Sequence, residues 1–315
     1  MPTTERIGVG TGSPEGANSA YLLPDRGVLI DPGPPTDEAW TALTEGIDAA
    51  GRGLGDVDHV VVTHWHVDHA GLAPRLAARA DATIHMHERD APLLADYAAA
   101  RRERVQRDAA TLAAWGVPES RVEAVRAGDE PSGLPATTPV GAHRDGETVA
   151  GGDLLHAPGH TEGHLAIRFG DALFVGDAVL PTYTPNVGGS DTRATDPLAD
   201  YLASLDRLEA HEGTFRPGHG RTLAPERFGV VREHHAERAR RVVEQLRTLG
   251  PATPWTVAEG LFGELRGVHV KFGAGESAAH LRSLASLGHV DRVEADPETY
   301  ALDGSVPKTA DLLPD

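Results

Sequence analysis

The sequence contains no cysteine among its 315 residues. This absence excludes disulfide bonds, thiolate metal ligands and a cysteine nucleophile. Any metal ion that the protein binds must therefore be held by histidine and carboxylate side chains.

Lysine is almost as scarce, since Lys271 and Lys308 are the only two, and the formal net charge is −18. Binding along a polynucleotide backbone requires clustered Lys or Arg side chains, so this composition argues against a broad nucleic-acid surface. The charge favours a hydrated acidic surface that stays soluble in high salt, although an ordinary acidic protein has a similar balance.

Long apolar runs are missing as well. No window approaches the ~20 apolar residues of a membrane span, and the N-terminus lacks the basic start and apolar core of a signal peptide. We therefore expect a cytoplasmic protein. At 315 residues, one large domain with a smaller one is the expected organisation.

Three imidazoles and a carboxylate are concentrated in the segment Thr63–Ala70, directly after the β-branched run His59–Val62. The spacing H-x-H-x-D-H cannot place all four side chains on one helical face, which requires gaps of three or four residues. A turn that leaves a strand can do so. We expect a strand over 59–62, an irregular connection that carries the four side chains, and a helix over Leu72–Arg79. This pattern is typical of a metal site with two neighbouring positions.

More histidines follow strand-like segments further along the chain. His160 and His164 lie in a turn after the apolar pair Leu154-Leu155, and His219 lies in a glycine-flanked turn after Thr214-Phe215. Both turns have the form of the first one, in which a strand delivers histidine side chains into an irregular connection.

Two aspartates also follow apolar strands. Asp177 comes after Gly176, whose missing side chain lets the backbone approach closely, and this placement suits a bridging metal ligand. Asp31 either starts a turn or accepts a hydrogen bond from a metal-bound histidine. His85 and His87 share one face of a strand, but nothing nearby completes a ligand set, so we do not expect metal there.

Taken together, these motifs resemble the metallo-β-lactamase superfamily. The resemblance rests on H-x-H-x-D-H at 64–69, G-H-T-x-G-H at 159–164, G-D at 176–177 and P-G-H-G at 217–220, and it covers about the first 225 residues. It implies an α/β fold, a four-layer αββα sandwich that holds two zinc ions, with iron or manganese as alternatives. The implied ligands are His64, His66 and His160 for one ion, Asp68, His69 and His219 for the other, and Asp177 between them.

Within the superfamily, the layout is most similar to the glyoxalase II relatives and, more closely, to the beta-lactamase-like protein 2 type. The first similarity implies hydrolysis of a thioester, and the second implies cleavage of single-stranded RNA. Two departures concern substrate access: Leu72 replaces a common glycine, and the helical segment 88–115 is long.

The resemblance and the helix stop at Gly250-Pro251 predict a metallo-β-lactamase domain over 1–225, a connecting helix over 226–250 and a C-terminal domain over 251–315. The C-terminal order of helix, helix and hairpin resembles a winged helix. This domain either contacts nucleic acid or packs as a wall of the active site, and its low basic charge favours packing. The residues available for nucleic acid would be Arg266, Lys271, His280 and Arg282.

Two zinc ions ~3.5–4 Å apart would share a water and lower its pKa from ~15.7 towards ~7, so that hydroxide forms at neutral pH. We expect Asp68 and Asp177 to be the catalytic carboxylates, with Asp31 and His164 behind the ligands. Tyr183 and Asn186 are candidates for substrate contact, and their neighbourhood offers no positive charge.

We therefore predict a hydrolase for a small ester or thioester, with a small-molecule substrate and no membrane partner. Nucleic acid is disfavoured, and the oligomeric state is left open. The alternatives are a metal-dependent endoribonuclease that acts on single-stranded RNA and a mono-iron persulfide dioxygenase.

Overall fold

The computed structural model describes residues 3–10, 16–303 and 312–314. The chain forms two compact units, each assembled from three segments. Unit 1 comprises Met1–Arg101, Pro131–Pro185 and Ser204–Phe228, and unit 2 comprises Arg102–Glu130, Asn186–Ala203 and Gly229–Asp315. The continuous domains over 1–225, 226–250 and 251–315 stay a prediction.

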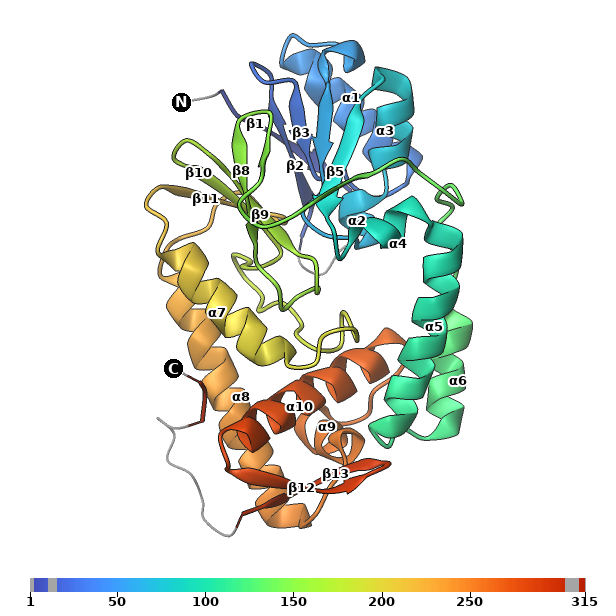
Figure 1. Ribbon diagram of the computed structural model, residues 1–315, viewed down its shortest axis with the longest axis vertical. Helices are drawn as coiled ribbons and strands as arrows, with labels where there is room; N and C mark the ends of the chain where they lie inside the picture. Colours follow the sequence, from blue (N-terminus) through green and yellow to red (C-terminus); the bar gives the residue numbers. More distant parts are fainter. Residues whose placement is uncertain (1–2, 11–15, 304–311, 315) are drawn as a thin grey trace. The chain divides into compact units, whose positions relative to one another are not determined.

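Two β-sheets make up the centre of unit 1 (Figure 1). The first sheet has the order β1-β2-β3-β4-β5-β6, with β1 at Glu5–Val9, β2 at Asn18–Leu23, β3 at Val28–Ile30, β4 at His59–Val61, β5 at Thr83–His87 and β6 at Gly141–His143. The second has the order β11-β10-β9-β8-β7, with β7 at Thr148–Val149, β8 at Gly152–His156, β9 at Leu165–Phe169, β10 at Ala172–Gly176 and β11 at Thr214–Pro217. Strands β3 to β6 are parallel, as are β10 and β11.

The two faces of the first sheet have different partners, because successive side chains of a strand point to opposite faces. On β2, Tyr21 and Leu23 belong to the apolar core shared with the second sheet, where the Tyr21 ring contacts Phe174 edge-on at 5.1 Å. Ala20 and Leu22 point the other way, into the core formed with helices α1 (Asp37–Ala49) and α3 (Ala73–Ala80). The sheets therefore stack face to face, and helices cover the outer face of the first.

The helix expected over 72–79 is present as α3, and the connecting helix expected over 226–250 is present as α8 at Arg227–Leu249. The other helical elements are η1 at Leu54–Asp56, α2 at Val67–Ala70, α4 at Ala91–Ala95, α5 at Tyr97–Ala114, α6 at Glu119–Gly128, α7 at Pro197–Glu209, α9 at Pro254–Phe262 and α10 at Val268–Ser286. Strands β12 at Val290–Ala295 and β13 at Glu298–Leu302 form the C-terminal hairpin. The helix, helix and hairpin order is present, and the winged-helix assignment stays a prediction.

Helix α10 begins at Val268, and its first half has a composition that helix propensity alone does not favour. Glycine disfavours a helix interior, and this part of α10 contains Gly273 and Gly275. A Cβ at Gly275 would collide with the backbone of Gly189 in the same unit. Close packing against that segment therefore outweighs the low helix propensity of the glycines.

Unit 2 contains a buried ion pair between Lys271 on α10 and Asp108 on α5, with Nζ 2.7 Å from Oδ2. The Thr192 hydroxyl donates to Asp108 Oδ1 at 2.6 Å, and this carboxylate therefore joins three segments of the unit. Lys271 and His280 are buried, and Arg282 pairs with Glu298 at 2.7 Å. Three of the four residues considered for nucleic-acid contact are thus engaged inside unit 2.

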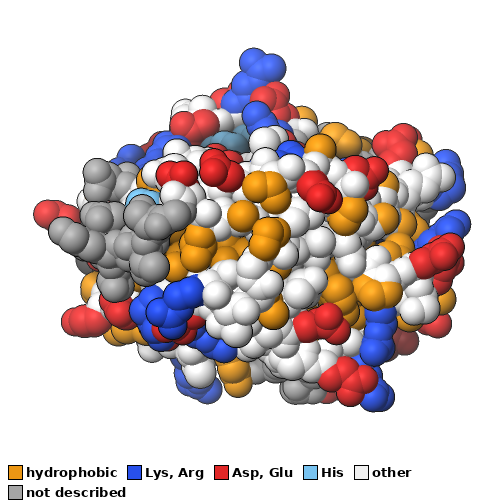
Figure 2. All heavy atoms as spheres, turned by 90° about the horizontal axis from the view of Figure 1, so that it is seen from below, with side chains coloured by type: hydrophobic (Ala, Val, Ile, Leu, Met, Phe, Trp, Pro, Cys, Tyr) orange, Lys and Arg blue, Asp and Glu red, His pale blue; other side chains and the backbone are white. Residues whose placement is uncertain are grey.

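Acidic, basic and apolar side chains are interspersed on the face drawn in Figure 2, and the described atoms of that face show no continuous basic area. Within the described ranges, none of the helices combines the length and the apolar character that a membrane span requires.

We predict that Asp108→Ala lowers the free energy of unfolding by about 3 kcal/mol, because it leaves the Lys271 ammonium buried without its carboxylate. Glu237→Ala is the matched control in the same unit, since it removes an exposed pair with Arg240 and should change stability little. Urea unfolding of the two variants measures the difference. Equal losses of unfolding free energy would show that the buried pair stabilises the protein no more than the exposed pair does.

Candidate metal centre

The four side chains of the 64–69 motif lie on two different types of backbone after β4. His64 and His66 lie on the turn after the strand, whereas Asp68 and His69 lie on the single helical turn α2. The expectation of an irregular connection throughout was therefore wrong for 67–70. Backbone hydrogen bonds from His69 N and Ala70 N to His66 O close this turn.

Three imidazoles converge on one position. His64 Nε2 and His160 Nε2 lie 3.0 and 3.1 Å from His66 Nδ1. Four tetrahedral ligands at ~2.0–2.1 Å from zinc are spaced about 3.3–3.4 Å apart, so these nitrogens need only a small outward shift to hold an ion. Burial lowers the pKa of His64 well below its usual range and lowers the pKa of His66 to about 3. These two rings are therefore neutral, which is the form that binds metal.

A second position lies beside the first. His219 Nε2 is 3.3 Å from His69 Nε2 and 3.4 Å from Asp68 Oδ2. Asp177 lies between the two positions, because it groups with His64 and His69 as well as contacting His219 Nε2 at 3.3 Å through Oδ2.

One carboxylate oxygen at this centre lacks a hydrogen-bond donor among the described residues. Asp177 Oδ1 is buried and accepts no hydrogen bond from the residues that the structure describes, although His69 Nε2 lies 3.4 Å away. A buried oxygen of this kind is costly unless a cation satisfies it. The donor set of imidazoles and carboxylates, without thiolates, fits divalent first-row metal ions.

At the second position, protonated histidines balance the negative charge of the carboxylates. Burial lowers the pKa of His69, but Asp177 and Asp68 outweigh burial and raise this pKa well above its usual range. Burial also lowers the pKa of His219, but Asp177 and Asp68 outweigh burial and raise this pKa to about 10. Burial raises the pKa of Asp177, but His69 and His219 outweigh it and hold the pKa well below its usual range. A divalent cation would take the place of these protons.

Asp31 makes the histidine contact that its position suggested. Its backbone is in the left-handed region, with φ of 50°, and its buried carboxylate accepts hydrogen bonds from Thr63 N and Thr63 Oγ1, both at 2.7 Å. The same carboxylate lies 3.1 Å from His69 Nδ1. This contact leaves Nε2 of His69 directed at the second position.

His164 lies behind Asp177. Its Nε2 accepts a hydrogen bond from Asp177 N at 3.2 Å, and burial lowers the pKa of His164 well below its usual range. The ring is therefore a neutral acceptor that fixes the backbone of Asp177. Its role as a residue behind the ligands fits this geometry better than a role in substrate contact.

Glycine allows the backbone of β11 to reach the centre. A Cβ added to Gly218 would collide with Asp177 Oδ1 and approach His69 Cε1 at 2.7 Å. The P-G-H-G turn can therefore deliver His219 only because position 218 has no side chain.

Sequence reasoning missed three groups around the centre. Asn18 donates to Asp68 Oδ2 at 3.1 Å, and Gly16 O lies 3.2 Å from His219 Nδ1. Asp90 contacts the turns that carry His66 and His160. None of the three stands in a motif, and Asp90 before Ala91-Pro92 looks like an ordinary helix start. The threonine of the G-H-T-x-G-H motif was the one signal that a buried acceptor lies nearby.

The two substrate-contact candidates belong to different units. Tyr183 is 49% exposed and belongs to unit 1. Asn186 belongs to unit 2, where its side-chain oxygen accepts from Gly189 N and Ser190 N at 3.0 and 2.8 Å. Asn186 thus stabilises a turn, and substrate contact by either residue stays a prediction.

The other histidines considered make contacts of their own. His85 lies between His59 and His143, at 3.0 and 2.9 Å between ring nitrogens. His87 stacks on His156 with ring centroids 3.9 Å apart.

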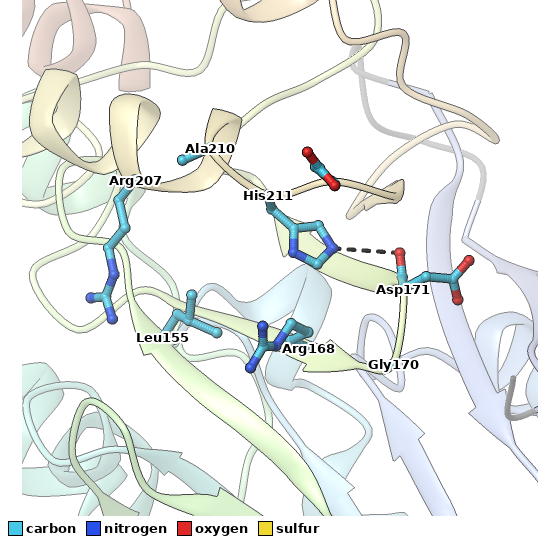
Figure 3. Close-up of a pocket in the computed structure, with 8 residues that line it drawn as sticks. Leu155, Arg168, Gly170, Asp171, Arg207, Ala210 and His211 are labelled. Carbon is cyan, nitrogen blue, oxygen red and sulfur yellow. Dashed lines mark hydrogen bonds between the residues drawn. The ribbon is translucent and has the colours of Figure 1, made fainter.

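Unit 1 also contains a cavity of about 610 Å³ whose lining residues are drawn in Figure 3. Arg168 and Arg207 line it, but they pair with Asp153 and Asp145. His211 Nε2 lies 3.4 Å from the carbonyl oxygen of Asp171. Both arginines of the cavity are paired with carboxylates, and none of the candidate ligands lines the cavity. The histidine cluster is therefore the candidate site.

Comparison with known proteins finds similarity over most of the chain. The family described as "Metallo-beta-lactamase superfamily" matches residues 13–219. The chain is 29% identical over 296 residues to the probable metallo-hydrolase YqjP of Bacillus subtilis, covering 88% of this chain and 87% of that protein. It is 31% identical over 253 residues to a hydroxyacylglutathione hydrolase of Acidiphilium cryptum, covering 78% and 83%.

Among solved structures, a metallo-beta-lactamase family protein from Thermus thermophilus superposes with a TM-score of 0.76 at 29% identity. The match covers 96% of this chain and 99% of that one. The predicted fold class is therefore confirmed.

The ligand set predicts close to two first-row metal ions per chain by elemental analysis, because seven ligands exceed what one tetrahedral ion can use. His64→Ala and Asp177→Ala should each lower the metal content. His211→Ala, a histidine that lines the separate cavity, is the control and should retain it. One ion per chain, with metal content and activity unaffected in Asp68→Ala, would contradict two positions.

Gly218→Ala should also lower the metal content, because the added methyl group occupies space beside Asp177 Oδ1. Gly229→Ala is the control, since a Cβ there meets nothing within 4 Å and alanine favours a helix. Metal content and circular dichroism are measured on both variants. A folded Gly218→Ala protein with full metal content would show that the turn tolerates a side chain.

Proposed function

The chain belongs to the metallo-beta-lactamase superfamily, and we propose that it is a metal-dependent hydrolase that cleaves a small ester or thioester. The observation that carries the proposal is the pair of adjacent ligand groups, His64, His66 and His160 on one side and Asp68, His69 and His219 on the other. Asp177 lies between them with an oxygen that accepts no hydrogen bond from the described residues.

Two zinc ions fit these groups best, since the donors are imidazole nitrogens and carboxylate oxygens, and iron or manganese are the alternatives. Bound divalent cations of this kind polarise a carbonyl oxygen and lower the pKa of water, so that attack on an acyl group proceeds at neutral pH.

The chain's own residues hold this centre in place. Asp31 orients His69, His164 holds the backbone of Asp177, and Asn18 donates to Asp68. Asp68 has 37% of its side chain exposed, against 8% for Asp177. Asp68 is therefore the more accessible of the two carboxylates to an entering substrate, and this exposure suits a proton acceptor. Attraction to His69 and a hydrogen bond with His219 outweigh burial and hold the pKa of Asp68 below its usual range, so it is ionised.

Two observations support an acyl substrate. The relative from Acidiphilium cryptum is named a hydroxyacylglutathione hydrolase, and hydroxyacylglutathione is a thioester. The run 181–186 after Asp177 offers hydroxyl and amide groups without positive charge. A polynucleotide needs clustered cations along its path, and one of the two lysines of this chain is buried against Asp108.

We expect the zinc-loaded protein to hydrolyse an acyl thioester, and to do so in both low and high salt. Asp177→Ala should lower kcat/KM by more than about 100-fold, because even residues behind metal ligands are worth 10–100-fold. His211→Ala should keep wild-type activity.

The same assay on labelled single-stranded RNA tests the alternative. Metal-dependent RNA cleavage without thioester or ester turnover would overturn the substrate proposal and leave the metal centre intact. Oxygen consumption with a persulfide, active with iron and inactive with zinc, would overturn the hydrolase itself.

A further inference from the structure

Asp90 is a buried carboxylate that does not belong to the candidate ligand set. It follows β5, and none of its surface is exposed. Its Oδ2 accepts hydrogen bonds from Trp65 N at 3.2 Å and from Thr161 Oγ1 at 2.8 Å, and its Oδ1 accepts one from Gly163 N at 3.0 Å. Three donors from two separate turns therefore converge on one side chain.

These donors lie next to candidate ligands. Trp65 stands between His64 and His66, and Thr161 directly follows His160. The ring nitrogens of His66 and His160 are 3.1 Å apart, although the two residues are 94 positions apart in the sequence. Asp90 is thus a direct polar link between the two turns that must meet at the three-histidine position.

Gly163 gives independent evidence that this turn is shaped around the carboxylate. A Cβ at position 163 would lie 2.5 Å from Asp90 Oδ1 and 2.6 Å from Asp90 Cγ. Any other residue at 163 would therefore push the turn and the carboxylate apart.

The chemistry of the contact requires an acid. An asparagine has one acceptor oxygen, and its amide group would face either Gly163 N–H or Trp65 N–H, so two donors would oppose each other. A carboxylate has two acceptor oxygens and can therefore serve all three donors.

The second position is held by other residues. Asp31 contacts His69, and Asn18 contacts Asp68. A disturbance at Asp90 should therefore affect one of the two metal positions and spare the other.

We propose that Asp90 is a positioning residue that sets the spacing of His66 and His160 and thereby the metal affinity of the three-histidine position. The proposal rests on the proposed metal binding and assigns the control of one position to a residue outside the ligand set.

The test compares Thr161→Val with Thr161→Ser in the full-length protein, using zinc and a chromophoric chelator to measure both dissociation constants. Thr161 is fully buried, and valine keeps its shape while removing the hydroxyl that donates to Asp90. We expect Thr161→Val to raise the dissociation constant of one zinc ion by about tenfold and to leave that of the other ion unchanged. Thr161→Ser keeps the hydroxyl and should restore wild-type affinity.

The same substitution made in the Asp68→Ala protein identifies which zinc ion is bound more weakly. Asp68→Ala removes a ligand of the other position, and in this background Thr161→Val should again weaken the remaining ion by about tenfold. Asp90→Asn should act in the same direction as Thr161→Val. If Asp90→Asn fails to fold, the valine and serine variants still decide the question.

Two results would overturn the proposal in distinguishable ways. A wild-type protein that holds two zinc ions, with both dissociation constants unchanged within twofold in Thr161→Val, would overturn the positioning role alone, even if the melting temperature falls. A wild-type protein that binds no zinc would overturn the proposed function together with it.

Discussion

The requirement to neutralise buried carboxylates governs the structure around this centre. Asp177 lies with its side chain almost fully buried beside Asp68, and ionised groups removed from water cost several kcal/mol unless they are paired. Protons on His69 and His219 supply the pairing in the absence of a cation. The same side chains form the groups that could hold a divalent cation, which would supply this pairing in place of the protons.

The packed strands of the two sheets fix the positions of the irregular segments that carry the candidate ligands. The candidate ligands follow β4, β8, β10 and β11, so each turn starts from a strand whose side chains are packed in the core. Catalytic groups are often carried on loops because a rigid scaffold positions them. Here two glycines complete the arrangement: Gly176 adopts φ of 50°, and Gly218 lets β11 approach Asp177.

The side chains that the structure groups at the candidate centre could be predicted, because each stands in a short motif with chemistry of its own. Asp90 and Asn18 could not, since their importance depends on which distant backbone and side-chain groups the fold brings to them. The start of α10 cannot be read from helix propensity for a related reason. Propensity counts against Gly275, whereas its packing against Gly189 depends on two segments that are far apart in the sequence.

The same rule about buried charge explains the polar core of unit 2. A chain with net charge −18 and two lysines places one of them, Lys271, where its single charge is shielded from water and matched by Asp108. Exposed pairs such as Arg240 with Glu237 weaken as salt rises, because the Debye length falls to ~3 Å at 1 M. A buried pair is screened much less. The Lys271–Asp108 pair therefore depends less on the salt concentration than the exposed pairs do.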